Sequence, residues 1–374
     1  MNQDLGLRLL GQIMAWTDER ARAEFEWIRL MSRLKYDSYE DFRAGVRFVE
    51  RLCVWLQQFD QPDRETAYGF VKDRLVYIGP AEMQILVDRF YIDVVERHLL
   101  RTIAEAAAIP SYKVWSTASA AASLKQRRRT LLFMGLSDGA RIDEFRRANT
   151  GILSNEQIVV ATQLDASKWR DLLKELRRDV GAGSVFSAIY LIDDFVASGT
   201  TMLRRDVESN VWKGKLIRFR ETLDEALRSM DGESILSADW SLHVHHYIAT
   251  SLAAEALHKR LTEAAETPSQ EWLRSVSLSF GTVLPPDLPL NEDSSDPFCQ
   301  LVKRYYDPTI ENRHSAVSGE MSLMWGYRKC GLPLVFEHNT PNNSLPILWA
   351  ETDGDPEKKI HAMRPLFRRR QRHS

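Results

Sequence analysis

The sequence predicts an α/β fold, in which a parallel-sheet core follows an N-terminal all-helical domain. Between residues 130 and 201, short apolar runs alternate with helical patterns, which is typical of strand–helix–strand units with right-handed crossovers. Before residue 125, apolar residues instead recur every three or four positions, as in amphipathic helices. We therefore expect a helical domain over 1–125, a sheet-containing domain over 126–350 and a basic C-terminal tail over 351–374.

Length and composition are those of a globular chain. Of 374 residues, 44% are hydrophobic and 27% are charged, which suits two domains and excludes a disordered chain. A formal net charge of −2 gives no sign of a nucleic-acid or membrane partner. Three isolated cysteines, Cys53, Cys299 and Cys330, favour a reducing compartment over a disulfide framework or a zinc site. Because the sequence shows neither a signal peptide nor a bilayer-length apolar run, we expect a cytoplasmic protein.

The helical domain is predicted from an apolar face and its breaks. A helix-start signal at 38–41 precedes apolar residues at spacings of four and three, namely Phe42, Val46, Val49, Cys53 and Leu56. Pro80 suits the first position of a later helix. Nothing here has the spacing of a catalytic motif. Packing or protein contact is therefore the simplest interpretation, with a winged-helix-like reader or a dimerisation unit as alternatives.

The character of the chain changes at Lys125–Arg129. This basic run is either a solvated linker or a patch for phosphates or nucleic acid. Two strand–helix units follow it. Their predicted elements are a strand at 130–134, the small-residue loop Gly135–Arg141, a helix at 142–148, a strand at 157–161 and a helix over about 166–179.

The most informative stretch is Ile189–Thr201. Its first four residues are apolar and predict a strand buried on both faces, and Asp193 and Asp194 stand at its end. A loop of small and hydroxyl residues follows, and Met202 is expected to begin a helix. Adjacent carboxylates can accept hydrogen bonds from vicinal hydroxyls, as on a ribose. Loop N–H groups at a helix start can hold a phosphate, and Gly199 lets the backbone approach it closely.

Two anion-suited loops are expected at the same edge of the sheet. Gly135–Arg141 and Ala197–Thr201 each follow the C-terminal end of a predicted parallel strand. Ligands of open parallel sheets bind beyond these ends, near a switch in strand order. We therefore predict one site built from both loops.

The later part of the chain is less specific. A strand is predicted at 241–250, with His243 and His245 on one face and His246 on the other. A histidine pair can bind a metal, but no companion ligand is evident, so satisfied imidazoles in a partly buried strand are the simpler interpretation. Residues 264–320 are expected to form a long surface insertion before a last buried strand at 331–336.

An Asn-rich loop follows that last strand. Amide side chains supply both donors and acceptors, so the loop is a candidate for recognising the edge of a base. Asparagine and proline are equally ordinary turn residues, and both interpretations stay open. The base-recognition candidates are His338, Asn339, Asn342 and Asn343.

Ile189–Thr201 resembles the 5-phosphoribosyl-1-pyrophosphate (PRPP) motif of type I phosphoribosyltransferases, an apolar strand, an acidic pair, two apolar residues and a Thr/Ser-Gly-x-Thr loop. The resemblance implies that Asp193 and Asp194 are catalytic residues that hold the ribose hydroxyls, with Mg²⁺ bound through the ligand or water. It implies that Arg141 faces the pyrophosphate. The residues implied in binding PRPP are Ser137, Asp138, Gly139, Val196, Ala197, Ser198, Gly199, Thr200 and Thr201.

The helical region, both loops and the closing segment 336–346 together resemble the phosphoribosyltransferase-like family of bacterial conflict and defence systems. This resemblance implies an effector or sensor of antiviral defence, in some cases beside a retron reverse transcriptase, with a protein or nucleic-acid partner and no membrane partner. No hood for a nucleobase and no flexible catalytic loop is recognisable in the sequence. Three interpretations therefore stay open: a phosphoribosyltransferase, a non-catalytic sensor of PRPP or a nucleotide, and a nucleic-acid-associated partner subunit.

Overall fold

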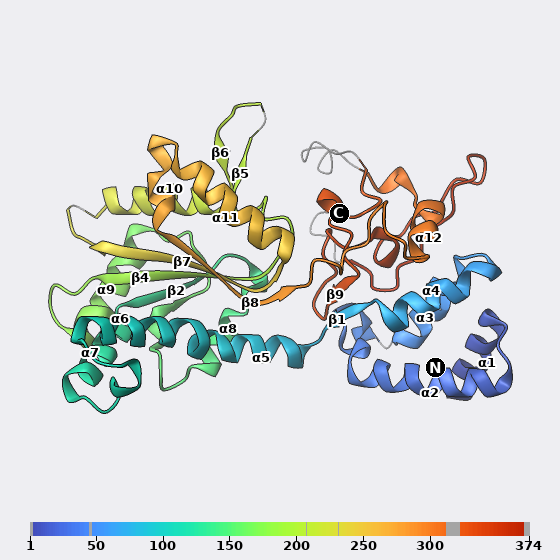
Figure 1. Ribbon diagram of the computed structural model, residues 1–374, viewed down its shortest axis with the longest axis horizontal. Coiled ribbons are helices and arrows are strands. Elements are labelled where there is room, and N and C mark those ends of the chain that lie inside the picture. The colour runs from blue at the N-terminus through green and yellow to red at the C-terminus, as the bar shows by residue number, and fades with distance from the viewer. Residues whose placement is uncertain (1–2, 45–46, 207, 231, 312–321, 370–374) are drawn as a thin grey trace. The chain divides into compact units, whose positions relative to one another are not determined.

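A computed structural model describes residues 3–44, 47–206, 208–230, 232–311 and 322–369 (Figure 1). The chain forms two compact units. Unit 1 contains Met1–Glu82 and Pro286–Ser374, and unit 2 contains Met83–Pro285. This division differs from the boundaries expected near 125 and 350. The helices after residue 83 pack on the sheet, whereas the C-terminal segment shares a core with the N-terminal helices.

Unit 2 is built on a five-stranded sheet in which all neighbouring strands are parallel. Their order across the sheet is β3-β2-β4-β7-β8, which confirms the predicted α/β fold with a parallel-sheet core. The strands are β2 (Leu131–Gly135), β3 (Ile158–Val159), β4 (Phe186–Val196), β7 (Leu236–Thr250) and β8 (Val276–Leu284).

Helices cover both faces of this sheet (Figure 1). The α-helices of unit 2 are the end of α5 (Pro80–Phe90), α6 (Arg97–Ala107), α7 (Ala118–Arg129), α8 (Ile142–Ala148), α9 (Ala166–Val180), α10 (Lys215–Arg228) and α11 (Ser251–Ala265). Three of them, α9, α10 and α11, share one hydrophobic cluster with one face of the sheet. The opposite face carries aromatic rings that meet α5 and α8; the Phe133 ring, for example, lies 5.1 Å from that of Phe145.

Two segments of unit 2 differ from the sequence-based expectation. Part of the expected surface insertion is β8, which pairs with β7 at the edge of the sheet. Val276, Leu278 and Phe280 alternate with serines and are partly buried, which is the pattern of a half-buried edge strand. The expectation of an insertion overlooked this pattern because the apolar residues do not form a continuous run. The helix expected from Met202 is instead a turn followed by a hairpin of β5 (Arg204–Arg205) and β6 (Trp212–Lys213), and α10 begins after that hairpin.

Unit 1 consists of helices and one short sheet. The sheet pairs β1 (Val76–Ile78) with β9 (Leu334–Phe336), so the last predicted strand lies here and not in the five-stranded sheet. The helices are α1 (Gln3–Met14), α2 (Asp18–Leu34), α3 (Phe48–Gln57), α4 (Arg64–Asp73) and α12 (Phe298–Tyr305). In the described parts of both units, no helix has the length and apolar character needed to cross a membrane.

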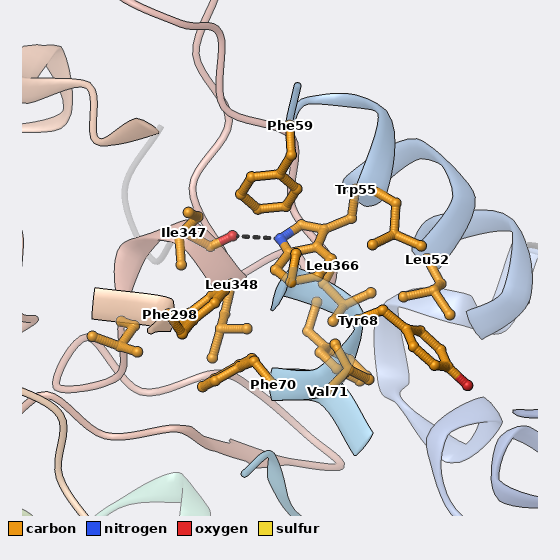
Figure 2. Close-up of a cluster of buried hydrophobic side chains, with 14 of the residues drawn as sticks. Leu52, Trp55, Phe59, Tyr68, Phe70, Val71, Phe298, Ile347, Leu348 and Leu366 are labelled. Carbon is orange, nitrogen blue, oxygen red and sulfur yellow. Dashed lines mark hydrogen bonds between the residues drawn. The ribbon is translucent and has the colours of Figure 1, made fainter. Parts of the chain in front are cut away.

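The core of unit 1 joins segments that are far apart in the sequence. Figure 2 shows apolar side chains from α3 and α4 packed against those of Phe298, Leu348 and Leu366. The Phe70 and Phe298 rings stack with their centroids 3.8 Å apart. Trp55 Nε1 donates a hydrogen bond to the carbonyl oxygen of Ile347 at 2.7 Å, which satisfies the indole N–H inside the cluster.

The described part of the C-terminal segment is not a solvated tail. Met363, Leu366 and Phe367 are each 0% exposed. The Phe367 ring lies within ring-contact distance of five aromatic residues of the N-terminal segment, Tyr36, Tyr39, Phe42, Phe48 and Tyr77. Three apolar residues among many arginines show no helical or strand period, so no sequence pattern identifies them as core residues. The basic residues at 370–372 lie outside the described residues.

We predict that Phe367→Ala lowers the free energy of unfolding of unit 1 by about 3–5 kcal/mol, because it leaves a cavity among aromatic rings. Urea titration followed by tryptophan fluorescence measures the change. Leu34→Ala is the control, since Leu34 is 69% exposed and its truncation should change stability by less than about 0.5 kcal/mol. Equal effects of the two substitutions would contradict a core role for the C-terminal segment.

Candidate functional site

The predicted loops meet where the strand order of the sheet reverses. From β2 the chain passes to β3 on one side, then crosses to β4 on the other. The register pairs Gly135 with Ile192, and Leu136 N donates to Ile192 O at 2.8 Å. The loops after β2 and β4 therefore lie side by side at the C-terminal edge of the sheet, which is where such folds bind ligands.

The carboxylate of Asp193 connects three segments at this edge. Its side chain is 5% exposed. Ser137 Oγ, from the loop after β2, donates to Asp193 Oδ1, and Lys215 Nζ, from α10, donates to Oδ2 at 2.5 Å. Burial and the neighbouring Asp194 raise the pKa of Asp193 to about 6, while Lys215 and Ser137 act in the opposite direction. At neutral pH we therefore treat Asp193 as a buried carboxylate balanced by an ammonium.

Asp194 faces the other side of the strand, because side chains alternate along it. Its Oδ1 accepts a hydrogen bond from Phe195 N at 2.8 Å. A Cβ on Gly139 would lie only 2.3 Å from Asp194 Oδ2, so the loop after β2 can approach this closely only with glycine at that position. The acidic pair and the loop after β2 are thus in direct contact, as the sequence predicted.

In the loop at Ala197–Thr201, which we call polarised, the carbonyl groups are hydrogen-bonded and the N–H groups are available. Each of its five carbonyl oxygens accepts a hydrogen bond from the protein. In the order of the carbonyls from Ala197 to Thr201, the donors are Thr250 Oγ1, Arg260 Nη1, the N–H groups of Met202 and Leu203, Arg204 Nη1 and Lys215 N. In contrast, within the described part of the chain the N–H groups of residues 198–201 have no hydrogen-bond acceptor. Consecutive N–H groups left available by a loop whose carbonyls are engaged elsewhere are suited to bind an anion.

The structure gives Gly199 a second role besides the predicted close approach to a phosphate. Gly199 has a φ of +69°, a left-handed conformation that favours glycine. A Cβ there would lie 2.9 Å from Leu257 Cγ and 3.0 Å from Arg260 Nη1, both on α11. A larger residue at this position would therefore strain the loop and push it off α11, whatever the ligand.

The hydroxyl groups of the loop differ in accessibility. Thr200 is 6% exposed, and its Oγ1 lies 2.9 Å from Ser198 Oγ. Thr201 is exposed, so its side chain is accessible to a ligand. Val196 and Ala197 are buried and anchor the start of the loop.

Lys215 is a site residue that the sequence-based prediction missed. It is the first residue of α10 and follows the hairpin that replaces the expected helix. Its side chain is 20% exposed, and its backbone N–H donates to Thr201 O at 2.9 Å. A faint signal exists in Gly214-Lys215, where a glycine precedes a helical apolar pattern.

The end of the loop after β2 carries Arg141 at the start of α8. Arg141 has a φ of +53°, its side chain is 20% exposed, and it lies 3.7 Å from the carboxylate of Glu144. Burial raises the pKa of the Tyr247 phenol, and the charges of Glu144, Arg141 and Asp194 also act on it. These charges therefore gather near Tyr247. Asp138 is exposed on the same loop.

The histidines of β7 are buried and neutral. His243 Nε2 lies 2.9 Å from Ser241 Oγ, and His245 Nδ1 lies 2.9 Å from Ser279 Oγ. Neither ring nitrogen of His246 has a partner among the described residues. No group of three or more metal-ligating side chains occurs in that part of the chain. His245 Nε2 also has no partner among the described residues, so His243 and His245 each have one bonded ring nitrogen, and His246 departs from the prediction of satisfied imidazoles.

The four base-recognition candidates belong to unit 1, whereas the two loops and the acidic pair belong to unit 2. Asn343 Nδ2 donates to Tyr327 O at 3.0 Å, and Asn342 O accepts from Tyr327 N at 2.7 Å. His338 Nδ1 lies 3.5 Å from Glu337. The contacts of Asn342 and Asn343 are those of residues that hold a turn. A base-recognition role for these four residues stays a prediction.

An open parallel sheet with an acidic pair and an anion-suited loop at its switch point is consistent with a phosphoribosyltransferase-like fold. The sequence matches the family model described as PRTase-CE over residues 52–369. The chain belongs to this family, and the match includes residues of both units. Comparisons with curated proteins and with solved structures found no match.

We predict that stability falls on acidification from pH 6 to 5. Burial lowers the pKa of His243 to about 4 and of His246 to about 3, and it also lowers that of His245. The unfolded chain then binds three protons at these histidines that the folded chain does not, whereas Asp193, with its raised pKa, binds one proton more in the folded chain. His98, whose pKa burial also lowers, adds to the difference. A net of at least two protons corresponds to at least roughly 2–3 kcal/mol per pH unit.

Urea titrations across this pH range measure the slope. His246→Leu removes one titrating group, so the slope of the free energy of unfolding against pH should decrease by the contribution of about one proton, roughly 1.4 kcal/mol per pH unit. Leu252→Ala, at an exposed position of α11, removes no titrating group and should leave the slope unchanged. A parent protein whose stability is constant or rises between pH 6 and 5 would contradict the assignment of neutral, buried imidazoles.

Proposed function

We propose that the protein binds PRPP, or a related ribosyl phosphate or nucleotide, at the edge of the sheet beside β2 and β4. The observation that carries this proposal is the polarised loop at Ala197–Thr201, whose available N–H groups follow the acidic pair directly. The loop suits a 5′-phosphate, and Asp193 and Asp194 suit sugar hydroxyls. Membership of a phosphoribosyltransferase-like family supports the same ligand class.

As an enzyme, the protein would catalyse pentosyl transfer with release of pyrophosphate. Asp193 and Asp194 position the sugar by accepting its hydroxyl protons in hydrogen bonds; they do not act as nucleophiles. Arg141 stabilises the negative charge that develops on the leaving pyrophosphate. Two adjacent carboxylates together with ligand phosphates are a donor set that Mg²⁺ uses, so the residues fit this ion, directly or through water. Bound there, Mg²⁺ neutralises phosphate charge.

A non-catalytic sensor of PRPP or a nucleotide is the second candidate function. The ion pair between Asp193 and Lys215 favours it, because a carboxylate engaged by an ammonium is a weaker ligand for a metal ion. Incubation with PRPP, Mg²⁺ and a panel of bases and nucleotides separates the two functions. Pyrophosphate release above a protein-free control identifies an enzyme, and PRPP binding without release identifies a sensor.

We propose further that the protein serves as an effector in a bacterial defence system, such as a retron-type system, with a protein or nucleic-acid partner. The support is the resemblance of both loops and the segment 336–346 to the defence-associated family. The cysteines at 53, 299 and 330 are free and buried, which suits action in the reducing cytoplasm.

We predict that Asp194→Asn weakens PRPP binding while the fold stays intact. The amide fills the same space but loses charge-assisted hydrogen bonds, each worth on the order of 1.5–3 kcal/mol. Asp193→Asn with Asp194→Asn should weaken binding further. Calorimetric titration measures the affinities, and Asp224→Asn, at a partly exposed ion pair on α10, is the control. Unchanged affinity in the double variant would refute the role of the pair.

A second prediction separates the pyrophosphate end of the site from the phosphate loop. Arg141→Ala should reduce the thermal stabilisation by PRPP and pyrophosphate more than that by ribose 5-phosphate, since only the first two reach the loop after β2. Thr201→Val should reduce the stabilisation by ribose 5-phosphate, because it removes one exposed hydroxyl donor. Gly199 is unsuited to this test, since its substitution disturbs the packing on α11. Equal losses for all three ligands in Arg141→Ala would place the pyrophosphate elsewhere.

A further inference from the structure

The position of Lys215 is fixed by the backbone of the phosphate loop. Gly214, just before it, has a φ of +139°, and a Cβ there would lie 2.3 Å from Met202 O. The next two N–H groups, of Lys215 and Leu216, donate to Thr201 O at 2.9 Å and Met202 O at 3.2 Å. The first turn of α10 is therefore tied to the end of the loop at Ala197–Thr201.

The side chain of Lys215 links this loop to the acidic pair. Its ammonium lies 2.5 Å from Asp193 Oδ2, while the side chain keeps 20% of its surface exposed. An ammonium has three N–H donors, and the contact with Asp193 uses one of them. Donors thus remain for a ligand that reaches from the loop to the acidic pair.

A second buried group marks the same place. His246 is paired in register with Asp193 and is 0% exposed, and neither of its ring nitrogens has a partner among the described residues. Burial and the nearby charge of Lys215 lower the pKa of His246, so its ring is neutral and brings no second positive charge. Lys215 is thus the cation in contact with Asp193, at 2.5 Å, while the enclosed His246 ring lies on the neighbouring strand.

We infer that Lys215 is a ligand-positioning residue, whose ammonium stays at Asp193 and donates a hydrogen bond to the sugar or 5′-phosphate oxygens of a bound ribosyl phosphate. This inference rests on the proposed function. It implies that the cation beside Asp193 is supplied by the protein itself. Ribose 5-phosphate, which has no pyrophosphate, then binds without a metal ion.

Calorimetric titration of the full chain with ribose 5-phosphate, in EDTA and in Mg²⁺, tests the inference. The parent should bind in both buffers. Lys215→Met should lose about tenfold or more in affinity in EDTA, the loss expected for one hydrogen bond to a charged group. Mg²⁺ should restore part of this loss by taking the vacated place beside Asp193. Lys215→Arg keeps the charge and should stay closer to the parent.

Lys213→Met is the matched control, because Lys213 lies two residues away on β6 and pairs with Asp206 at 3.0 Å. Its affinities should equal those of the parent. Inorganic pyrophosphate is the control ligand: a general lesion in Lys215→Met would weaken its binding too, whereas the loss of a positioning lysine would not. Melting temperatures without ligand report whether each variant folds.

Several outcomes overturn the inference. Parent-like affinity of Lys215→Met in EDTA shows that the lysine only balances the buried carboxylate. Tighter binding shows that it blocks the site and must leave before the ligand enters. Equal losses in both buffers and for pyrophosphate indicate a structural role. In these cases the proposed function stands. If the parent protein binds neither ribose 5-phosphate, in either buffer, nor PRPP, both the proposed function and the role of Lys215 are overturned.

Discussion

The architecture of unit 2 depends on the placement of one buried carboxylate. Asp193 stands at the end of the central strand, and a charge in that position is costly unless the surrounding segments compensate it. Ser137 from the loop after β2 and Lys215 from α10 do so. The same contacts bring the two predicted loops and the helix start to one edge. The contacts that compensate the charge of Asp193 are therefore the same contacts that assemble the site.

The parts of the fold that the sequence predicted are those with local, uninterrupted patterns. The apolar run before Asp193 predicted β4, and the spacing of Trp169, Leu172 and Leu176 predicted the buried face of α9. The loops after β2 and β4 followed from small residues placed after such runs. Their contact followed from the rule that parallel strands end at one edge. These inferences needed only neighbouring residues and the topology of strand–helix units.

Most of what the sequence did not predict depends on long-range packing. Phe367 is recognisable as a core residue only beside aromatic residues more than 280 positions earlier. β8 is an exception, because its alternation of apolar residues and serines is a local strand pattern that the search for continuous apolar runs passed over. Lys215 escaped notice because a hairpin separates it from the loop that it contacts. Three of the donors that engage the carbonyls of Ala197–Thr201 likewise come from distant elements, namely β7, α11 and α10, which no local motif reveals.

The discontinuous make-up of unit 1 has a consequence for biogenesis. As the chain leaves the ribosome, Met1–Glu82 emerges before unit 2, but its core partners lie in Pro286–Ser374 and are translated after all of unit 2. Domains generally fold in the order of synthesis, so unit 2 can close on itself while Trp55, Phe59 and Phe70 still expose apolar surface. Nascent chains that stall after residue 285 would be natural clients for chaperones.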